Sequence, residues 1–84
     1  MTYQEMPNTA ATAYAVTQNL TVLEYNNFRK VERNIFEAKN KDDVFLAYDN
    51  SYKWFLSERE AYIQLKKDLL EELKKTELII EFSK

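Results

Sequence analysis

The feature that most constrains the fold is a run of apolar residues at helical spacing between residues 58 and 76. At about 100° per residue, one side of a helix there carries Tyr62, Leu65, Leu69, Leu70 and Leu73. The opposite side carries Glu60, Gln64, Lys67, Glu71 and Lys75. Ser57-Glu58-Arg59-Glu60 has the S-x-x-E form of a capping box, which marks a helix start. The sequence therefore predicts an amphipathic helix from about 58 to 76.

Three earlier segments also fit a helical period. Thr21-Val22-Leu23-Glu24 has the form of a second capping box, and a helix from about 21 to 38 follows it. Residues 44–56 project as a helix with one continuous apolar arc, although a hairpin that turns at Asp49-Asn50 is the alternative. Residues 9–20 mix alanine with threonine, and we interpret them as a short helix.

These segments predict an all-α fold, a small bundle of three helices with an open option of a fourth near the N-terminus. The runner-up is an α+β fold with a hairpin at 44–56 and a third strand at 78–82. Residues 1–8 are expected to form a loose arm, and 9–84 a single small helical domain. If the last helix continued past 76, Leu78 and Phe82 would fall on its polar side, so 77–82 is either a helical extension or a strand.

Composition excludes most catalytic sites. The chain has no cysteine, no histidine and no glycine, which removes thiolate and imidazole chemistry, ordinary transition-metal sites and glycine-rich phosphate loops. Carboxylates remain, but the neighbours in Asp42-Asp43 and in Glu71-Glu72 would point about 100° apart on a helix. We therefore predict that the protein is not an enzyme and needs no cofactor and no metal.

Charge and hydropathy bear on partners and compartment. Twelve basic residues face fourteen acidic ones, a net charge of −2, so we do not expect a nucleic-acid partner. The basic patch that such a partner would use is Arg29, Lys30, Arg33 and Lys41. No run of about 18 apolar residues predicts a membrane span, and the first residues lack a secretion signal, so a cytoplasmic location is expected. Abundant Lys, Asn, Tyr, Phe and Ile indicate an AT-rich gene, as in phages.

Apolar surface is the remaining pointer to function. The predicted arc of 44–56 is wider than a surface helix needs, and it is rich in aromatic residues, which dominate interface energetics. Such stripes also form cores, and we expect Phe55 to face inward and Trp54 to lie at the edge. The predicted interface is Tyr48, Tyr52, Trp54, Leu78 and Phe82. We predict a protein–protein interaction module: a homo-oligomer, or an adaptor or inhibitor of a larger protein. A small nucleic-acid-binding regulator is the alternative.

Overall fold

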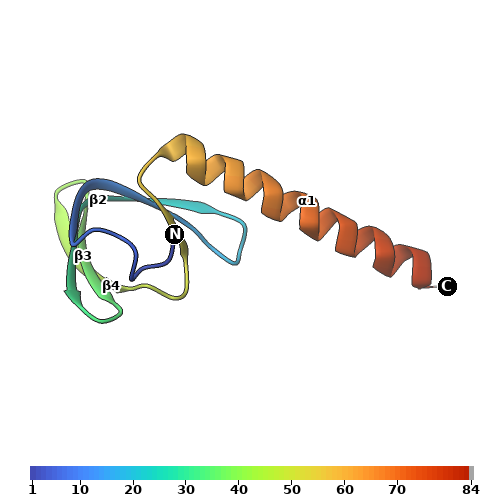
Figure 1. Cartoon of the computed structure of the whole chain (residues 1–84), viewed down its shortest axis with the longest axis horizontal. Coiled ribbons are helices and arrows are strands. Elements are labelled where there is room, and N and C mark those ends of the chain that lie inside the picture. The colour runs from blue at the N-terminus through green and yellow to red at the C-terminus, as the bar shows by residue number, and fades with distance from the viewer. Residues whose placement is uncertain (84) are drawn as a thin grey trace.

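A five-stranded antiparallel sheet followed by one long helix makes up the fold (Figure 1). The structure is a computed structural model that describes residues 1–83. The elements are β1 (Thr9–Val16), β2 (Val22–Glu32), β3 (Ile35–Asn40), β4 (Asp43–Tyr48), β5 (Lys53–Phe55) and α1 (Glu58–Phe82). The predicted all-α bundle is therefore wrong, because the three segments before residue 57 that we interpreted as helices are strands and turns.

The sheet order is β4-β3-β2-β1-β5. The first four strands form a meander, and β5 then pairs with β1 at the other side of the sheet, with Ala15 opposite Trp54. The runner-up fold is therefore also wrong in its details. Segment 44–56 does contain two strands and a turn, but β4 and β5 lie on opposite edges and do not pair as a hairpin. Residues 78–82 are helical.

The error over 21–38 has a local cause. The register of β2 against β3 shifts between Asn26 and Arg29, and Asn27 has a φ of 51°. This bulge adds one residue to β2, so Tyr25 and Phe28 are both buried although they lie three positions apart. Spacing of three is what an amphipathic helix shows. The supposed capping residue Thr21 instead hydrogen-bonds with the Thr17 side chain in the β1–β2 turn, at 2.7 Å.

Strands β1 and β4 were not recognised in the sequence for a different reason. In β1 the inward positions Ala13 and Ala15 are alanines, whose helix propensity is the highest of any residue. In β4 both faces are apolar: Phe45 and Ala47 pack against the core, while the alternate residues point outward. The alternation of polarity that normally identifies a strand is absent there.

Turns in this glycine-free chain use other residues in the left-handed region. Lys41 connects β3 to β4 with a φ of 59°, and Asn50 and Ser51 follow β4 with φ of 53° and 59°. Two consecutive positive φ values, with the Tyr52 amide donating to the Asp49 carbonyl at 3.2 Å, fit a type I′ turn. Glycine is the usual marker of such turns, so its absence removed the strongest turn signal from the sequence.

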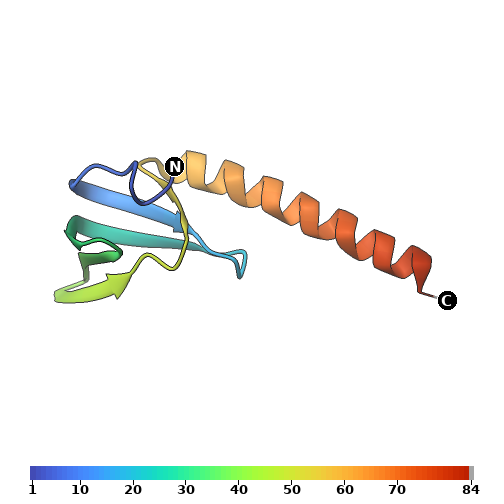
Figure 2. The ribbon, with the colours of Figure 1, turned by 60° about the horizontal axis from the view of Figure 1, so that its bottom comes forward.

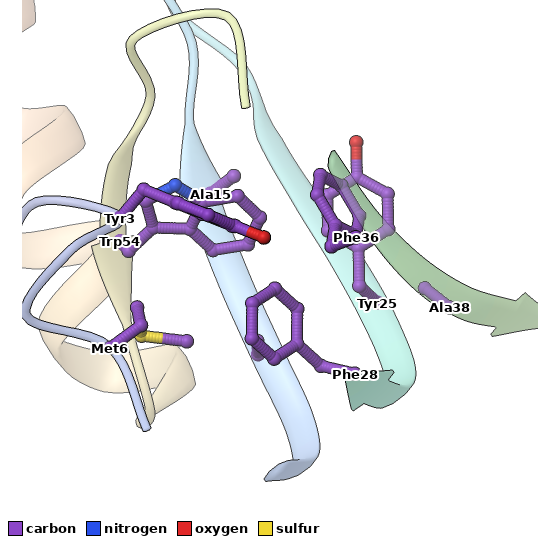
Figure 3. Packing of buried hydrophobic residues seen from close by; sticks show 9 residues of the cluster. Tyr3, Met6, Ala15, Tyr25, Phe28, Phe36, Ala38 and Trp54 are labelled. Carbon is purple, nitrogen blue, oxygen red and sulfur yellow. The ribbon is translucent and has the colours of Figure 1, made fainter. Parts of the chain in front are cut away.

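An aromatic cluster packs against one face of the sheet (Figure 3). Trp54 is at its centre, with ring centroids 5.2 Å from Phe36, 5.3 Å from Phe28 and 5.7 Å from Tyr25. Its indole Nε1 donates a hydrogen bond to the buried carboxylate of Asp49. The cluster takes side chains from the N-terminal segment and from β1, β2, β3 and β5, so it connects β5 to strands that are distant from it in the sequence.

Residues 1–8, which we expected to be a loose arm, pack onto this cluster. Tyr3 and Met6 are buried, and the Tyr3 hydroxyl donates to the Ile35 carbonyl at 2.8 Å. The Trp54 amide donates to the Met1 carbonyl at 2.8 Å, and the Met1 amino group donates to the Trp54 carbonyl at 3.0 Å. The segment therefore covers both the core and the outer edge of β5.

Candidate interaction surface

Helix α1 begins as the sequence predicts. Ser57 is the N-cap, and its side chain accepts a hydrogen bond from the Glu60 amide at 3.5 Å. The prediction of a helix over 58–76 is confirmed, and the helix continues to Phe82, which resolves the open alternative for 77–82. In Figures 1 and 2 the helix leaves one side of the sheet and projects away from it.

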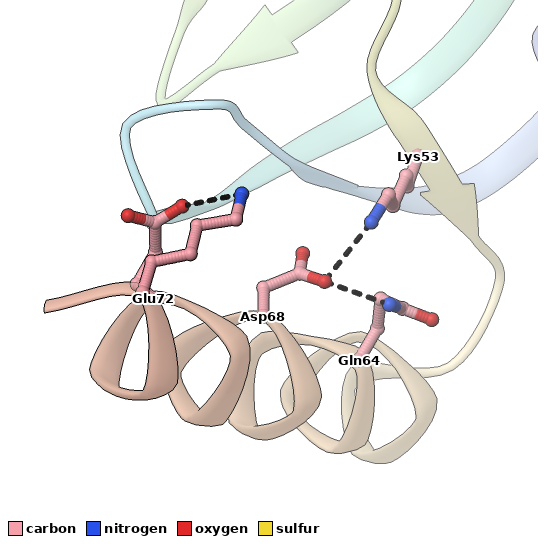
Figure 4. Close-up of polar contacts among 5 residues, drawn as sticks. Lys53, Gln64, Asp68 and Glu72 are labelled. Carbon is pink, nitrogen blue, oxygen red and sulfur yellow. Dashed lines mark hydrogen bonds and ion pairs between the residues drawn. The ribbon is translucent and has the colours of Figure 1, made fainter. Parts of the chain in front are cut away.

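Only the first part of α1 touches the sheet. Ala61 is buried, and Gln64, Leu65 and Asp68 are half-buried, all on one helical face. The Lys53 ammonium of β5 and the Gln64 amide both donate to the same oxygen of Asp68, each at 2.9 Å (Figure 4). Partial burial acts to raise the pKa of Asp68, but these two hydrogen bonds and the Lys53 charge outweigh it and hold the pKa below its usual value.

From Leu69 onward every described residue of α1 is exposed. Nine of the sixteen exposed large apolar residues among residues 1–83 lie on this one helix. They are Tyr62, Ile63, Leu69, Leu70, Leu73, Leu78, Ile79, Ile80 and Phe82. Both helical members of the predicted interface are among them, and Phe82 is 81% exposed. Single exposed apolar residues are ordinary, but so many on one helix are unusual and make α1 the candidate interaction surface.

Trp54 does not belong to any surface. It is 0% exposed, and all its contacts are with this chain. Its predicted place at the edge of an apolar arc depended on a helix that the chain does not form. Phe55, predicted to face the core, is only half-buried. The expected order of the two residues is therefore reversed, because neighbours on β5 point to opposite faces of the sheet.

Tyr48 and Tyr52 lie close together at the end of β4. They line an open depression of about 500 Å³ whose other walls are polar. Those walls are Thr2, Gln4, Asn34, Asp49, Asn50 and Ser51, with Tyr3 beneath. Asp49 is the one carboxylate among them, and it accepts the Trp54 indole hydrogen bond. The other titratable groups of this depression are tyrosine phenols, and burial together with the Asp49 charge raises the pKa of Tyr3 above its ordinary value.

The outer edge of β4 is a second exposed surface. The Asp49 backbone amide donates to the Asn34 carbonyl at 2.8 Å, which makes these two residues a hydrogen-bonded pair that continues the β3–β4 ladder. Because such pairs alternate, the backbone groups of Val44, Leu46 and Tyr48 point away from β3. The side chains of the same three residues are exposed, at 61%, 66% and 64%. Within residues 1–83 no strand pairs with this edge.

The predicted basic patch is divided by the fold. Arg29 forms an ion pair with Glu37 of β3. Lys30 donates to the Met6 carbonyl at 2.6 Å and lies 5.0 Å above the Tyr3 ring, so it anchors the N-terminal segment. Arg33 and Lys41 are exposed in the two turns at opposite ends of β3. The four residues therefore do not gather on one surface.

The described residues contain no group of three or more carboxylates that could hold a metal ion. The pairs Asp42-Asp43 and Glu71-Glu72 are exposed, on the β3–β4 turn and on α1. In the same part of the chain no helix combines the length and the apolar character that crossing a membrane requires.

Comparison with known proteins gives no relative to set beside this geometry. No family model, no curated protein and no solved structure matches the chain. The site must therefore be interpreted from its own residues.

Several residues that shape these surfaces were not singled out from the sequence. Asp68 and Lys53, which join α1 to the sheet, lie fifteen positions apart, and no local pattern links them. Val44, on the β4 edge, was assigned to a helical apolar arc, and its neighbour on the same edge, Leu46, fell outside that arc. A strand interpretation of 43–48 places them opposite the side of Phe45 and Ala47, which is the signal that could have found them.

Proposed function

We propose that this chain is a non-enzymatic protein–protein interaction module that docks through α1. The observation that supports the proposal most is that α1 continues for about four turns beyond Asp68, its last half-buried residue, while carrying seven large, exposed apolar residues. These seven are Leu69, Leu70, Leu73, Leu78, Ile79, Ile80 and Phe82. Proteins commonly bind by laying the apolar residues of a helix in a groove of a partner, and α1 projects from the sheet domain in a way that suits this mode.

Helix energetics support the same proposal. An isolated helix shorter than about 12–15 residues is marginal in water, and most helical stability in proteins comes from packing of an apolar face. Residues 69–82 receive no such packing from this chain. Local help is small: the Lys75–Glu72 ion pair, at 3.4 Å, is exposed and contributes a few tenths of a kcal/mol. A partner that covers the apolar residues would supply the missing stabilisation.

No specific observation favours the alternative of a nucleic-acid-binding regulator. Arg29 and Lys30 are engaged within the chain, and Arg33 and Lys41 lie at opposite ends of β3. Phosphate binding depends on several cations that face one backbone. The cytoplasm is the compartment we propose, since a fold without cysteine does not depend on an oxidising environment.

The test uses two variants of α1 that each raise the net charge by one. Leu73→Lys places a charge beside Leu69 and Ile80, whereas Glu71→Gln makes the same change in charge about 160° around the helix from Leu73. Each tagged variant and the wild type are expressed in the source cell beside an untagged copy. Captured proteins are identified, purified and titrated against each bait.

We expect a purified partner, whether another copy of this chain or a different protein, to bind wild type and Glu71→Gln alike. It should bind Leu73→Lys at least about tenfold more weakly, which corresponds to about 1.4 kcal/mol. Equal binding by all three baits contradicts the proposal. So does a chain that binds no purified protein at micromolar concentration.

A further inference from the structure

The exposed face of α1 contains a regular seam. Residues 62, 66, 69, 73, 76 and 80 recur at alternating steps of four and three, the spacing of a coiled-coil seam. We call these six positions the α1 seam: Tyr62, Lys66, Leu69, Leu73, Thr76 and Ile80. At 100° per residue the seam lies about 110° around the helix from the face that contacts the sheet. A second helix can therefore lie along the seam without displacing the sheet.

The α1 seam has the same polarity when it is followed from either end. The order is apolar, polar, apolar, apolar, polar, apolar. A two-fold symmetric interface needs such a pattern, because every contact must occur twice with the two chains exchanged. An axis at residue 71 would place Tyr62 opposite Ile80 of a second chain and Leu69 opposite Leu73. The two polar positions, Lys66 and Thr76, would then meet each other.

From this pattern we propose that the partner of α1 is a second copy of the chain, bound antiparallel along the α1 seam. The inference rests on the proposed function and names its partner. The positions that flank the seam meet diagonally in an antiparallel pair of helices. With the same axis, Leu70 lies against its own copy and Leu65 lies against Ile79, so apolar contacts flank the seam. With about 1.5 Å of rise per residue, α1 is about 37 Å long, and the two sheets would lie at opposite ends of the helix pair.

Charge separates the antiparallel arrangement from the parallel one. Parallel pairing would place Lys66 against Lys66 within the seam and Glu72 against Glu77 on both flanks. Such like-charge contacts disfavour an arrangement. Antiparallel pairing removes these like-charge contacts and leaves a single one, in which Glu72 lies near its own copy. In this structure Glu72 already forms an ion pair with Lys75 of its own chain, at 3.4 Å. The antiparallel dimer therefore has the better charge complementarity.

The absence of cysteine allows a direct test by disulfide trapping. Tyr62→Cys and Ile80→Cys chains, one of them mass-tagged, are purified, mixed at micromolar concentration and oxidised. Lys74→Cys, away from the seam, reports random collision. Both seam positions are exposed, so we expect the substitutions to leave the fold intact, which circular dichroism of each variant checks.

We expect a mixed disulfide between residue 62 of one chain and residue 80 of the other, at least about tenfold above the Lys74→Cys background. Ile80→Cys alone should stay at background, because antiparallel pairing holds its two copies about 27 Å apart along the axis, beyond the ~7 Å Cα limit of a disulfide. Efficient trapping of Ile80→Cys with itself overturns the antiparallel arrangement. A wild-type monomer by sedimentation equilibrium at tens of micromolar overturns the second copy as partner. Capture of a different protein that depends on Leu73 would then still support the proposed function.

Discussion

The sheet and residues 69–82 of α1 differ in where their large apolar residues lie. In the sheet domain the large aromatic residues face one another, and Trp54, Phe28 and Phe36 are fully buried. In α1 beyond Asp68 the large apolar residues face outward. The first arrangement stabilises the domain without a partner, whereas the second leaves a helix that a partner would stabilise. Under the function that we propose, folding and binding are therefore carried by separate parts of this short chain.

The largest expected effect is on the core. Trp54→Ala should destabilise the domain by about 3–5 kcal/mol, because it removes the central ring of the cluster and leaves the buried Asp49 carboxylate without its donor. Ile80→Ala, a truncation on the exposed helix, should change the free energy of unfolding of the monomer by less than about 0.5 kcal/mol. Urea denaturation at low protein concentration measures both. Similar losses for the two variants would remove the distinction between the two regions.

A smaller effect should follow at the N-terminal segment. Tyr3→Phe removes the hydroxyl that donates to the Ile35 carbonyl, so this partly buried hydrogen bond is lost at a cost of about 0.5–1.5 kcal/mol. The matched control is Tyr62→Phe, whose hydroxyl is on the exposed helix, and it should be neutral. If Tyr3→Phe is also neutral in thermal melts, residues 1–8 do not contribute to the fold as the structure shows.

The turn at Lys41 offers a stabilising change. Its φ of 59° strains a residue with a side chain, so Lys41→Gly should raise the free energy of unfolding by about 0.5–1 kcal/mol. Lys39→Gly, two residues earlier within β3, should lower it by about the same amount. Opposite signs in chemical denaturation support the strand–turn–strand arrangement. Loss of stability in both variants is what a helix over this segment would give.

The weakest effect concerns the link between the two regions. The folded-state pKa of Asp68 lies below its ordinary value of 3.8. The contribution of Asp68 to the free energy of unfolding is therefore fully present above the unfolded-state pKa. It is lost as the pH falls through the lower, folded-state pKa. Wild type should exceed Asp68→Asn by up to about 1 kcal/mol in free energy of unfolding at pH 7, and the difference should shrink as the pH falls below 3.8 and disappear below the folded-state pKa. Asp42→Asn serves as the control, and a difference independent of pH would contradict this account.

Local signals predicted α1 well and the sheet poorly. The Ser57 cap and the spacing of Leu65, Leu69 and Leu73 depend on neighbours within two turns, so the sequence carries them directly. The strands depend on distant partners: Trp54 faces residues from β2 and β3, which no local pattern connects. The bulge at Asn27 also imitates helical spacing.

The candidate surface was predicted in part. Tyr48, Leu78 and Phe82 are exposed, as an interface would require, whereas Trp54 is buried. Whether the exposed three bind a partner stays a prediction. Leu78 and Phe82 were singled out because they do not fit the apolar face of a single helix, and that reasoning did not depend on the wrong fold. Trp54 was placed by an arc that does not exist.

Amide hydrogen exchange at two protein concentrations tests the central claim most directly, because it reports on the sheet and on α1 in one measurement. At sub-micromolar concentration we predict strong protection in β1–β3 and weak protection over residues 69–82. At tens of micromolar, protection over 69–82 should rise at least about tenfold while that of the sheet changes little, since binding stabilises what it covers. Protection over 69–82 that is already high and independent of concentration, in a chain that binds no other protein, would contradict the account.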